Sequence, residues 1–222
     1  MSNLEEQINN IRWWHSIPMG GYVSPGENKE VEDTFNNLPL PADLAGKTVL
    51  DIGCWDGYYS FMCEERGAKV TASDKYIWGN DYISGVDYWT KDAGFDLAKK
   101  VRKSNVEKLV ASVEELDPEI HGKFDIVLML GVIYHAKDPI GYMQKAFDLS
   151  NDLVIFEAHV DMNHLDYPAA RYYISAELNN DATNYWGMNR AAICGIMTDI
   201  GFKNIQHHTL RTGRMIFSGN VR

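Results

Sequence analysis

The sequence predicts an α/β fold: a Rossmann-like, mostly parallel sheet of seven strands with helices on both faces and an antiparallel last strand. Three observations support it. Short apolar runs alternate with stretches of helical spacing along the 222 residues, which is the pattern of strands joined by helices. The run at residues 124–130 is apolar almost throughout, as in a strand buried on both faces. A glycine-containing turn follows the first run, as where strand meets helix in such sheets.

Local patterns place each element. Leu4, Ile8, Ile11 and Trp14 recur at near-helical spacing, and Pro139 suits the first turn of a helix. The predicted helices cover residues 3–17, part of 27–45, 58–66, 92–103, 139–149 and 188–200. The predicted strands cover residues 49–52, 70–73, 106–111, 124–130, 152–158, 204–209 and 214–218, the last two joined by a turn.

The length suggests one domain with a small appended piece. We expect residues 46–222 to form the main domain and residues 1–45 to form a helical N-terminal segment. Trp13 and Trp14 in this segment precede a loop rich in Gly and Pro. The two rings either pack in the core and clamp the first helix, or form a lid over a ligand, because aromatic rings exclude water and attract cations.

The turn after the first strand is the clearest candidate for a binding site. Val49, Leu50 and Ile52 lead into Gly53-x-x-x-Gly57, and a helix is predicted from residue 58. A strand, a glycine turn and a helix open a nucleotide site in α/β sheets. Gly53 lets the backbone approach a ligand, and the helix directs free N–H groups toward it. An ordinary strand-to-helix turn is the alternative.

The spacing in this turn distinguishes between ligands. A dinucleotide fold requires a third glycine that this turn lacks. Asp51 lies at the end of the first strand, where a carboxylate repels a pyrophosphate but suits a cation. Asp74 closes the next strand and can hydrogen-bond a ribose diol. Together the two acids predict an adenosyl ligand with a positively charged, amine-bearing tail.

These residues resemble the class I S-adenosylmethionine-dependent methyltransferases, in which the glycine loop lies against the methionine part and the second acid holds the ribose. A narrower resemblance, over residues 13–202 with gaps, is to the tRNA wobble-uridine carboxymethyltransferase group. It rests on Trp14, the segment 49–58, Phe124-Asp125 and the segment 131–135. The cofactor-binding residues that we expect are Trp14, Asp51, Gly53, Cys54, Gly57, Asp74, Lys75, Val113, Glu114, Leu130 and Tyr134. The segment that contains Val113 and Glu114 fits a capped helix start equally well.

Methyl transfer leaves the protein to position the acceptor and, where needed, to remove a proton. Tyr134 and His135 follow the fourth strand, and we expect both to be catalytic. An imidazole with an ordinary pKa of about 6.5 can act as a base, although a structural histidine is also common at a strand end. Aromatic residues outside the predicted strands are expected to contact the acceptor: Tyr22, Trp78, Tyr172 and Trp186.

Composition limits the partners. The net charge is −10, and the one dense basic cluster, residues 99–103, suits a solvated helix face, so a large polyanion is disfavoured. No apolar run reaches the length of a membrane span. The N-terminus is acidic and polar, and three cysteines lack the spacing of metal ligands. We expect a cytoplasmic protein with reduced thiols, no metal and no membrane contact.

Three functions follow from these patterns. The first is methyl transfer from S-adenosylmethionine to an oxygen or nitrogen of a small molecule of the secondary-metabolite type. The carboxylated donor of the wobble-uridine group needs basic partners, and His15-Ser16 follow Trp14 here, so the plain donor is predicted. The second function is a tRNA wobble-uridine methyltransferase. The third is a non-catalytic protein that binds S-adenosylmethionine. The sequence gives no information on the oligomeric state.

Overall fold

The computed structural model describes residues 3–76 and 91–222. Its main sheet has seven strands in the order β10-β11-β7-β6-β3-β4-β5, and the predicted fold class is confirmed. By internal contacts the chain divides into two compact units, Met1–Val110 and Ala111–Arg222. The predicted N-terminal segment, residues 1–45, belongs to the first unit together with the glycine turn.

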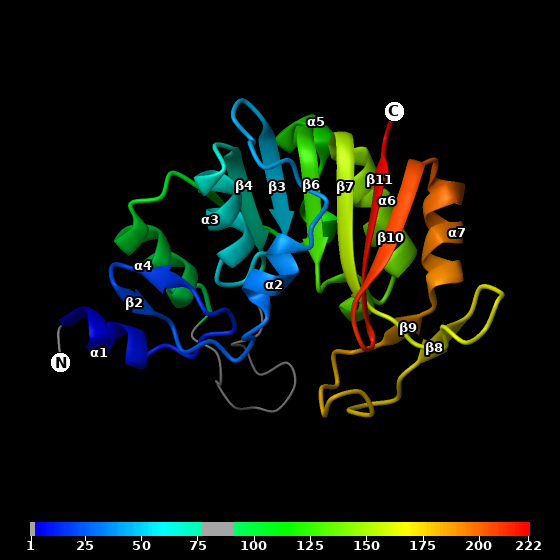
Figure 1. Ribbon diagram of the computed structural model, residues 1–222, viewed down its shortest axis with the longest axis horizontal. Coiled ribbons are helices and arrows are strands. Elements are labelled where there is room, and N and C mark those ends of the chain that lie inside the picture. Colours follow the sequence, from blue (N-terminus) through cyan, green and yellow to red (C-terminus); the bar gives the residue numbers. More distant parts are fainter. Residues whose placement is uncertain (1–2, 77–90) are drawn as a thin grey trace. The chain divides into compact units, whose positions relative to one another are not determined.

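In the first unit, three parallel strands carry the candidate binding site. They are β3 (Thr48–Ile52), β4 (Lys69–Asp74) and β5 (Glu107–Val110). Because Ile52 pairs with Ser73, the carboxyl ends of β3 and β4 lie side by side (Figure 1). The helices of this unit are α1 (Asn3–Asn9), α2 (Val31–Asn36), α3 (Tyr58–Glu65) and α4 (Ala93–Arg102).

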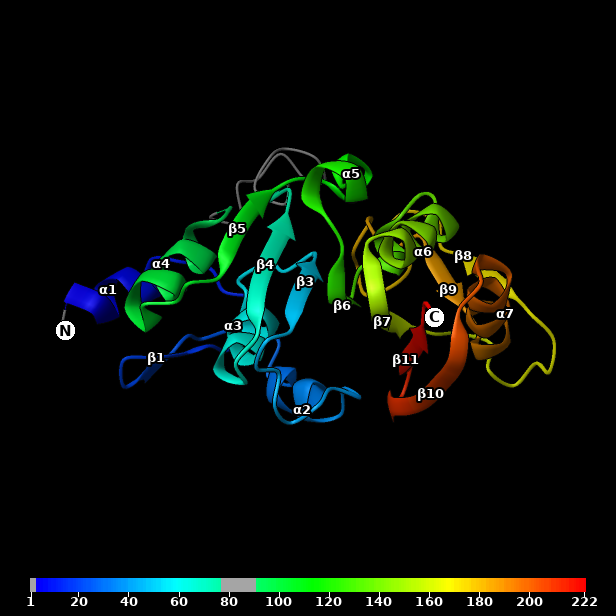
Figure 2. The ribbon, with the colours of Figure 1, turned by 90° about the horizontal axis from the view of Figure 1, so that it is seen from above.

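In the second unit, β6 (Phe124–Leu130) and β7 (Ser150–His159) are parallel. The last strand, β11 (Arg214–Asn220), is antiparallel both to β7 and to β10 (Lys203–Arg211), as predicted. The helices α6 (Pro139–Asp148) and α7 (Arg190–Ile200) contact each other and these strands (Figure 2). The shorter elements are η2 (Val113–Glu115), α5 (Pro118–His121), η3 (Ile133–His135), β8 (Ala170–Tyr172) and β9 (Trp186–Met188).

Side-chain caps fix where the long helices of the second unit begin. Asp138 directly precedes Pro139, the first residue of α6. Its carboxylate accepts a hydrogen bond of 2.9 Å from the N–H of Gly141. The Asn189 side chain does the same for Ala192 at the start of α7. Both residues satisfy N–H groups that a helix leaves unpaired at its first turn.

The N-terminal helix is shorter than predicted. The helix predicted over 3–17 ends at Asn9, and the backbone beyond it is extended: the carbonyls of Trp13 and Trp14 accept hydrogen bonds from Glu27 and Asn28. A hairpin of β1 (Pro18–Met19) and β2 (Tyr22–Val23) follows. Apolar spacing alone could not show this, because the partners lie about fourteen residues away along the chain.

Candidate cofactor and acceptor sites

Both glycines of the predicted turn have positive φ values, which favour glycine. Gly53 (φ 75°) donates a hydrogen bond to the carbonyl of Ser73 over 2.8 Å, and Gly57 has φ 88°. A Cβ on Gly57 would lie 2.7 Å from the Phe95 ring. Between the glycines, Trp55 also lies in the left-handed region, with φ 49°, which is uncommon for a large side chain and concentrates at functional sites.

Asp74 joins the end of β4 to this turn. One carboxylate oxygen, Oδ2, accepts a hydrogen bond from the N–H of Trp55 over 3.0 Å, and Oδ1 accepts one from the N–H of Tyr76 over 2.7 Å. The side chain is buried, and burial raises its pKa. Asp74, the residue predicted to bind the ribose, is therefore in contact with the predicted glycine turn.

Asp51 lies within β3 and faces the helix that follows the turn. It is 1% exposed, and its Oδ2 accepts a hydrogen bond from the Ser60 hydroxyl in α3 over 2.6 Å. Burial raises its pKa to about 7. The Ser60 hydroxyl thus ties Asp51 to the helix that follows the turn.

Asp56 is a buried acid of the glycine turn that the sequence interpretation did not name. It is 2% exposed, and its Oδ2 accepts hydrogen bonds from the backbone N–H groups of Trp14 (2.7 Å) and His15 (2.9 Å). Burial raises its pKa to about 7. The sequence signal that could have drawn attention to Asp56 is its position between Gly53 and Gly57, as a further acid close to Asp51. Asp56 ties the N-terminal segment to the turn, while the role of that segment as a lid stays a prediction.

Two tryptophans flank this connection. The rings of Trp14 and Trp55 lie 5.9 Å apart between centroids, and Trp14 is 37% exposed. Trp13, in contrast, is buried and donates from its indole nitrogen to the carbonyl of Ile8. Beside them His15 is buried, and burial lowers its pKa to about 3. It is uncharged at neutral pH.

The other predicted residues of the first unit are placed as follows. Cys54 is buried, with its sulfur 3.5 Å from the Tyr76 hydroxyl, and Lys75 is exposed. Tyr22 lines a cavity with Glu64 and Glu65, at the end of α3 opposite Gly57, so it lies away from the glycine turn. Trp78 lies outside the described residues.

In the second unit, Tyr134 packs against a buried ion pair that the sequence did not reveal. Arg214 donates to both carboxylate oxygens of Glu157, each over 2.5 Å, and its guanidinium lies 4.8 Å from the centre of the Tyr134 ring. Burial raises the pKa of Tyr134. Gly131 has φ 74°, so its backbone conformation favours glycine, while a Cβ there would only make ordinary contact with the Tyr134 hydroxyl at 3.5 Å.

His135 is the second predicted catalytic residue. Its ring centroid lies 4.3 Å from that of Tyr134, and its Nδ1 lies 3.0 Å from the carbonyl oxygen of Thr183. Burial lowers its pKa to about 4. His135 is therefore a neutral imidazole at physiological pH, the form that can accept a proton.

Val113, Glu114 and Leu130 lie in the same unit. Val113 and Leu130 are buried, and the carboxylate of Glu114 accepts a hydrogen bond from the Tyr142 hydroxyl over 2.6 Å. The N–H of Ser112 donates to Glu115, so the capped start is present. Contact of Val113 or Glu114 with an adenine stays a prediction.

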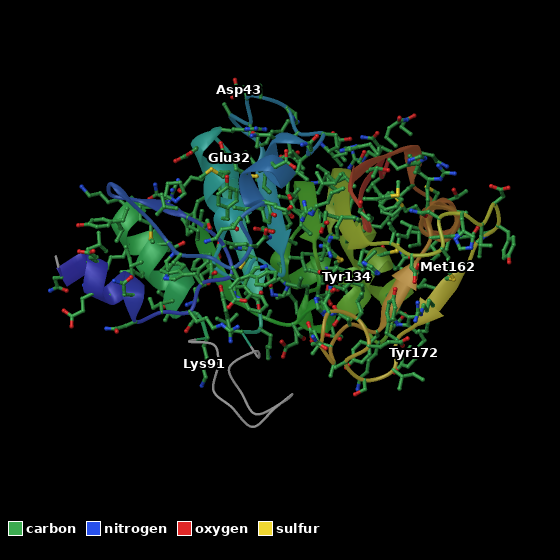
Figure 3. The ribbon with its side chains drawn as sticks, turned by 60° about the horizontal axis from the view of Figure 1, so that its bottom comes forward. Glu32, Asp43, Lys91, Tyr134, Met162 and Tyr172 are labelled. Atoms are coloured by element: carbon green, nitrogen blue, oxygen red, sulfur yellow. The ribbon has the colours of Figure 1, made fainter. Side chains whose placement is uncertain are left out.

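Tyr172 and Trp186 belong to a small sheet that the sequence did not predict. They pair across β8 and β9, with ring centroids 5.1 Å apart. Tyr172 also stacks on Tyr185 at 6.4 Å with an angle of 14° between the rings, and it is 55% exposed. Figure 3 shows Tyr172 on β8 and Tyr134 in η3. The two predicted acceptor-binding residues thus form one aromatic cluster.

A family model described as a methyltransferase domain matches residues 27–207. The chain belongs to this family. S-adenosylmethionine, the predicted methyl donor, fits the residues of the first unit. There a buried acid, Asp74, contacts the turn in which Gly53 leaves the backbone accessible. The predicted membership of the class I methyltransferases and the predicted donor are confirmed at the level of the family.

Curated relatives narrow the comparison. The tRNA U34 carboxymethyltransferase of Campylobacter concisus is 33% identical over 133 residues, which are 58% of this chain and 42% of that protein. The protein of the same name from Haemophilus influenzae is 29% identical over 182 residues, or 76% and 49%. The chain spans about half the length of these relatives. The predicted resemblance to the wobble-uridine group is confirmed.

Solved structures share the fold. The N-terminal domain of EvdMO1, crystallised with S-adenosylhomocysteine and D-fucose, superposes with a TM-score of 0.71 at 18% identity, covering 100% of this chain and 98% of that one. Magnesium protoporphyrin IX methyltransferase from Synechocystis PCC 6803 gives 0.58 at 18% identity, covering 86% and 78%. At such identities the likeness concerns the fold.

Two further observations concern residues 3–76 and 91–222. Within these ranges no helix has both the length and the apolar character that crossing a membrane requires. No group of three or more histidine, cysteine or acidic side chains in the same ranges is arranged to hold a metal ion.

Proposed function

We propose that the chain methylates the wobble uridine of a tRNA with S-adenosylmethionine as the donor. The contact between Asp74 and the glycine turn carries the donor assignment, because it places a buried acid beside backbone that a ligand can approach. Similarity to tRNA U34 carboxymethyltransferases supports the acceptor. A cytoplasmic location, expected from the sequence, is part of this proposal.

In this proposal the first unit holds the donor. Asp74 binds the ribose hydroxyls, Gly53 lies against the methionine part, and the buried acids Asp51 and Asp56 favour a cation. S-adenosylmethionine, when bound, supplies a methyl carbon whose bond to the positively charged sulfur breaks with the electron pair left on sulfur.

We propose the plain donor rather than the carboxylated one that the family resemblance implies. An additional carboxylate needs a cation to compensate it. His15 is uncharged, since burial lowers its pKa to about 3. Arg214 already binds both oxygens of Glu157, so this pair carries no net charge to offer.

An acceptor that bears a proton must lose it when it is methylated. His135 accepts that proton in this proposal: its imidazole is neutral at physiological pH, and the Asp181 carboxylate, whose charge raises the pKa against the lowering by burial, stabilises the imidazolium that forms. Tyr134 contacts the acceptor beside it. The aromatic cluster of Tyr172, Tyr185 and Trp186 offers ring faces on which a base can stack.

The test is incubation of the purified chain with total tRNA and S-adenosylmethionine labelled in the methyl group. We expect label in the wobble nucleoside, identified by mass spectrometry of the digested tRNA, and a steep loss of tRNA binding with added salt. Asp74→Ala, assayed beside the exposed control Asp43→Ala, should abolish the labelling. Unlabelled tRNA under conditions where S-adenosylmethionine binds would contradict the acceptor.

A small molecule methylated at oxygen or nitrogen is the second candidate acceptor. The net charge of −10 favours it, because tRNA backbones are anionic. The same labelled donor, added to a metabolite extract without RNA, tests this function. Label in a metabolite but not in tRNA supports it. Binding of the donor with no transfer to either pool would support the non-catalytic function.

A further inference from the structure

The loop that precedes β9, residues 181–185, contacts His135 and its neighbour Tyr134. Residues 181–185 contact the segment 134–135 twice: the N–H of Tyr185 donates to the carbonyl of Tyr134 over 2.9 Å, and Thr183 binds the His135 ring. Asp181 shapes this loop by accepting hydrogen bonds from both the N–H (2.9 Å) and the hydroxyl (2.6 Å) of Thr183. Neither Asp181 nor Thr183 was singled out from the sequence.

The contacts determine which ring nitrogen of His135 carries the proton. The nitrogen Nδ1 lies 3.0 Å from the carbonyl oxygen of Thr183, and a carbonyl oxygen can only accept a hydrogen bond. The hydroxyl oxygen Oγ1 of Thr183 lies 3.0 Å from the same nitrogen. Because that hydroxyl donates its hydrogen to Asp181, it too can only accept from Nδ1.

Both neighbours of Nδ1 therefore require it to be the donor. In a neutral imidazole a proton on Nδ1 leaves Nε2 as the acceptor. Burial and the nearby positive charge of Arg214 lower the pKa of the imidazole, whereas the hydrogen bond to the Thr183 backbone and the Asp181 carboxylate raise it. The charged groups that act on His135 are thus Asp181 and Arg214.

We propose that Asp181 and Thr183 are positioning residues that hold His135 as the Nδ1–H tautomer, with Nε2 as the atom that receives the proton of the methyl acceptor. The proton leaves the acceptor atom as that atom forms its bond to the methyl carbon, and it ends on Nε2. The base role rests on the proposed function, whereas the tautomer depends only on this loop.

The experiment is NMR of the full chain labelled with ¹⁵N-histidine, in which the two ring nitrogens report their protonation directly. His135→Gln assigns the signals among the seven histidines. We expect wild-type His135 at neutral pH to show a protonated Nδ1 and an unprotonated Nε2. An imidazolium, or a proton on Nε2, would overturn the proposal.

Two variants at position 181 separate hydrogen bonding from folding. Asp181→Ala frees the Thr183 hydroxyl to donate to Nδ1, so we expect the Nδ1–H signal to be lost in part to the Nε2–H tautomer. Asp181→Asn keeps an oxygen that accepts from the hydroxyl, and it should restore the wild-type spectrum. Asp166→Ala, an exposed acid in the same region, is the control.

The remaining outcomes are decisive as well. An Asp181→Ala spectrum identical to wild type, in a variant whose thermal unfolding is unchanged, would overturn the role of Asp181. If Asp181→Ala does not fold, Thr183→Val serves instead, because it removes Oγ1 and retains the carbonyl, which can only accept; the Nδ1–H tautomer should then persist, and its loss would overturn the role of the Thr183 carbonyl. Absence of methyl transfer by the wild type would refute the proposed function but not the tautomer.

Discussion

The backbone N–H of Trp55 donates a hydrogen bond to Oδ2 of Asp74 over 3.0 Å. This bond links the glycine turn after β3 to the end of β4, and it forms although Trp55 lies in the left-handed region. Such a backbone conformation costs about 1–2 kcal/mol for a residue with a side chain. Asp74 helps to hold it by accepting from both Trp55 and Tyr76.

Removing the Asp74 carboxylate should therefore affect ligand affinity and stability together. Asp74→Ala is expected to weaken S-adenosylhomocysteine binding at least about tenfold, since hydrogen bonds to a charged group contribute about 1.5–3 kcal/mol. It also leaves two N–H groups unpaired, and each costs about 1–3 kcal/mol when buried. Isothermal titration and thermal unfolding measure the two effects, with Asp43→Ala as the control. Unchanged affinity would refute the ribose assignment.

A pair of glycines isolates the packing behind the turn. Gly57 and Gly46 both have positive φ, 88° and 75°. A Cβ on Gly57 meets the Phe95 ring at 2.7 Å, whereas one on Gly46 has nothing within 4 Å. Gly46→Ala should lower the free energy of unfolding by about 1 kcal/mol, and Gly57→Ala by about 1–3 kcal/mol more. Chemical denaturation measures both.

If the clash causes the difference, Phe95→Leu should recover part of the loss in the Gly57→Ala background and none in the Gly46→Ala background. Equal losses for the two alanine variants would show that the Phe95 ring moves aside at little cost in free energy. The contact with Phe95 would then not be the reason that position 57 requires glycine.

The buried acids make the stability of the protein without ligand depend on pH. Burial raises the pKa of Asp51 and Asp56 from 3.8 to about 7. The folded protein then binds more protons than the unfolded chain between about pH 4 and pH 7, so stability falls as pH rises through this window and levels off above it. Thermal unfolding across this range measures the effect, and Asp51→Asn with Asp56→Asn should flatten it.

The same ionisation should tune donor binding in the opposite direction. S-adenosylmethionine carries a sulfonium, whose attraction to these groups requires that they be ionised. Its affinity should rise with pH up to about 7, in line with the raised pKa values of the two acids. S-adenosylhomocysteine, which lacks the sulfonium charge, is the matched control and should show a smaller rise. Parallel pH profiles for the two ligands would contradict this electrostatic role.

Much of the fold could be predicted because it is encoded locally. The strand at Thr48–Ile52 and the turn at Gly53 and Gly57 show themselves in a few consecutive residues. Asp74 was identifiable for the same reason, since it ends the next strand. Contacts between distant segments were not identifiable. The extended backbone around Trp14 depends on residues near position 27.

The contacts that the sequence interpretation did not foresee share this cause. Asp56 binds the N–H of Trp14, 42 positions earlier, and Asp181 binds Thr183, which lies 48 positions after its contact His135. Tyr22 was predicted to contact the acceptor as an aromatic residue of a glycine-rich loop, and it lies by the end of α3 opposite Gly57; its binding role stays a prediction. Aromatic composition does not indicate which end of a helix a hairpin contacts.

The ion pair of Glu157 and Arg214 provides the last prediction. Glu157 is 3% exposed and is bound through both oxygens. Removing one partner of a buried pair leaves a charge without compensation, at a cost of about 3–5 kcal/mol, whereas replacing both partners can be nearly neutral. Glu157→Gln alone should lower the free energy of unfolding by about 3 kcal/mol, near the lower limit because the Arg214 side chain is 22% exposed.

The double variant with Arg214→Met should recover most of this loss. Chemical denaturation of the two single variants and the double variant gives the coupling between the residues. Additive losses would show that the guanidinium contributes to stability mainly through its packing on Tyr134 rather than through Glu157.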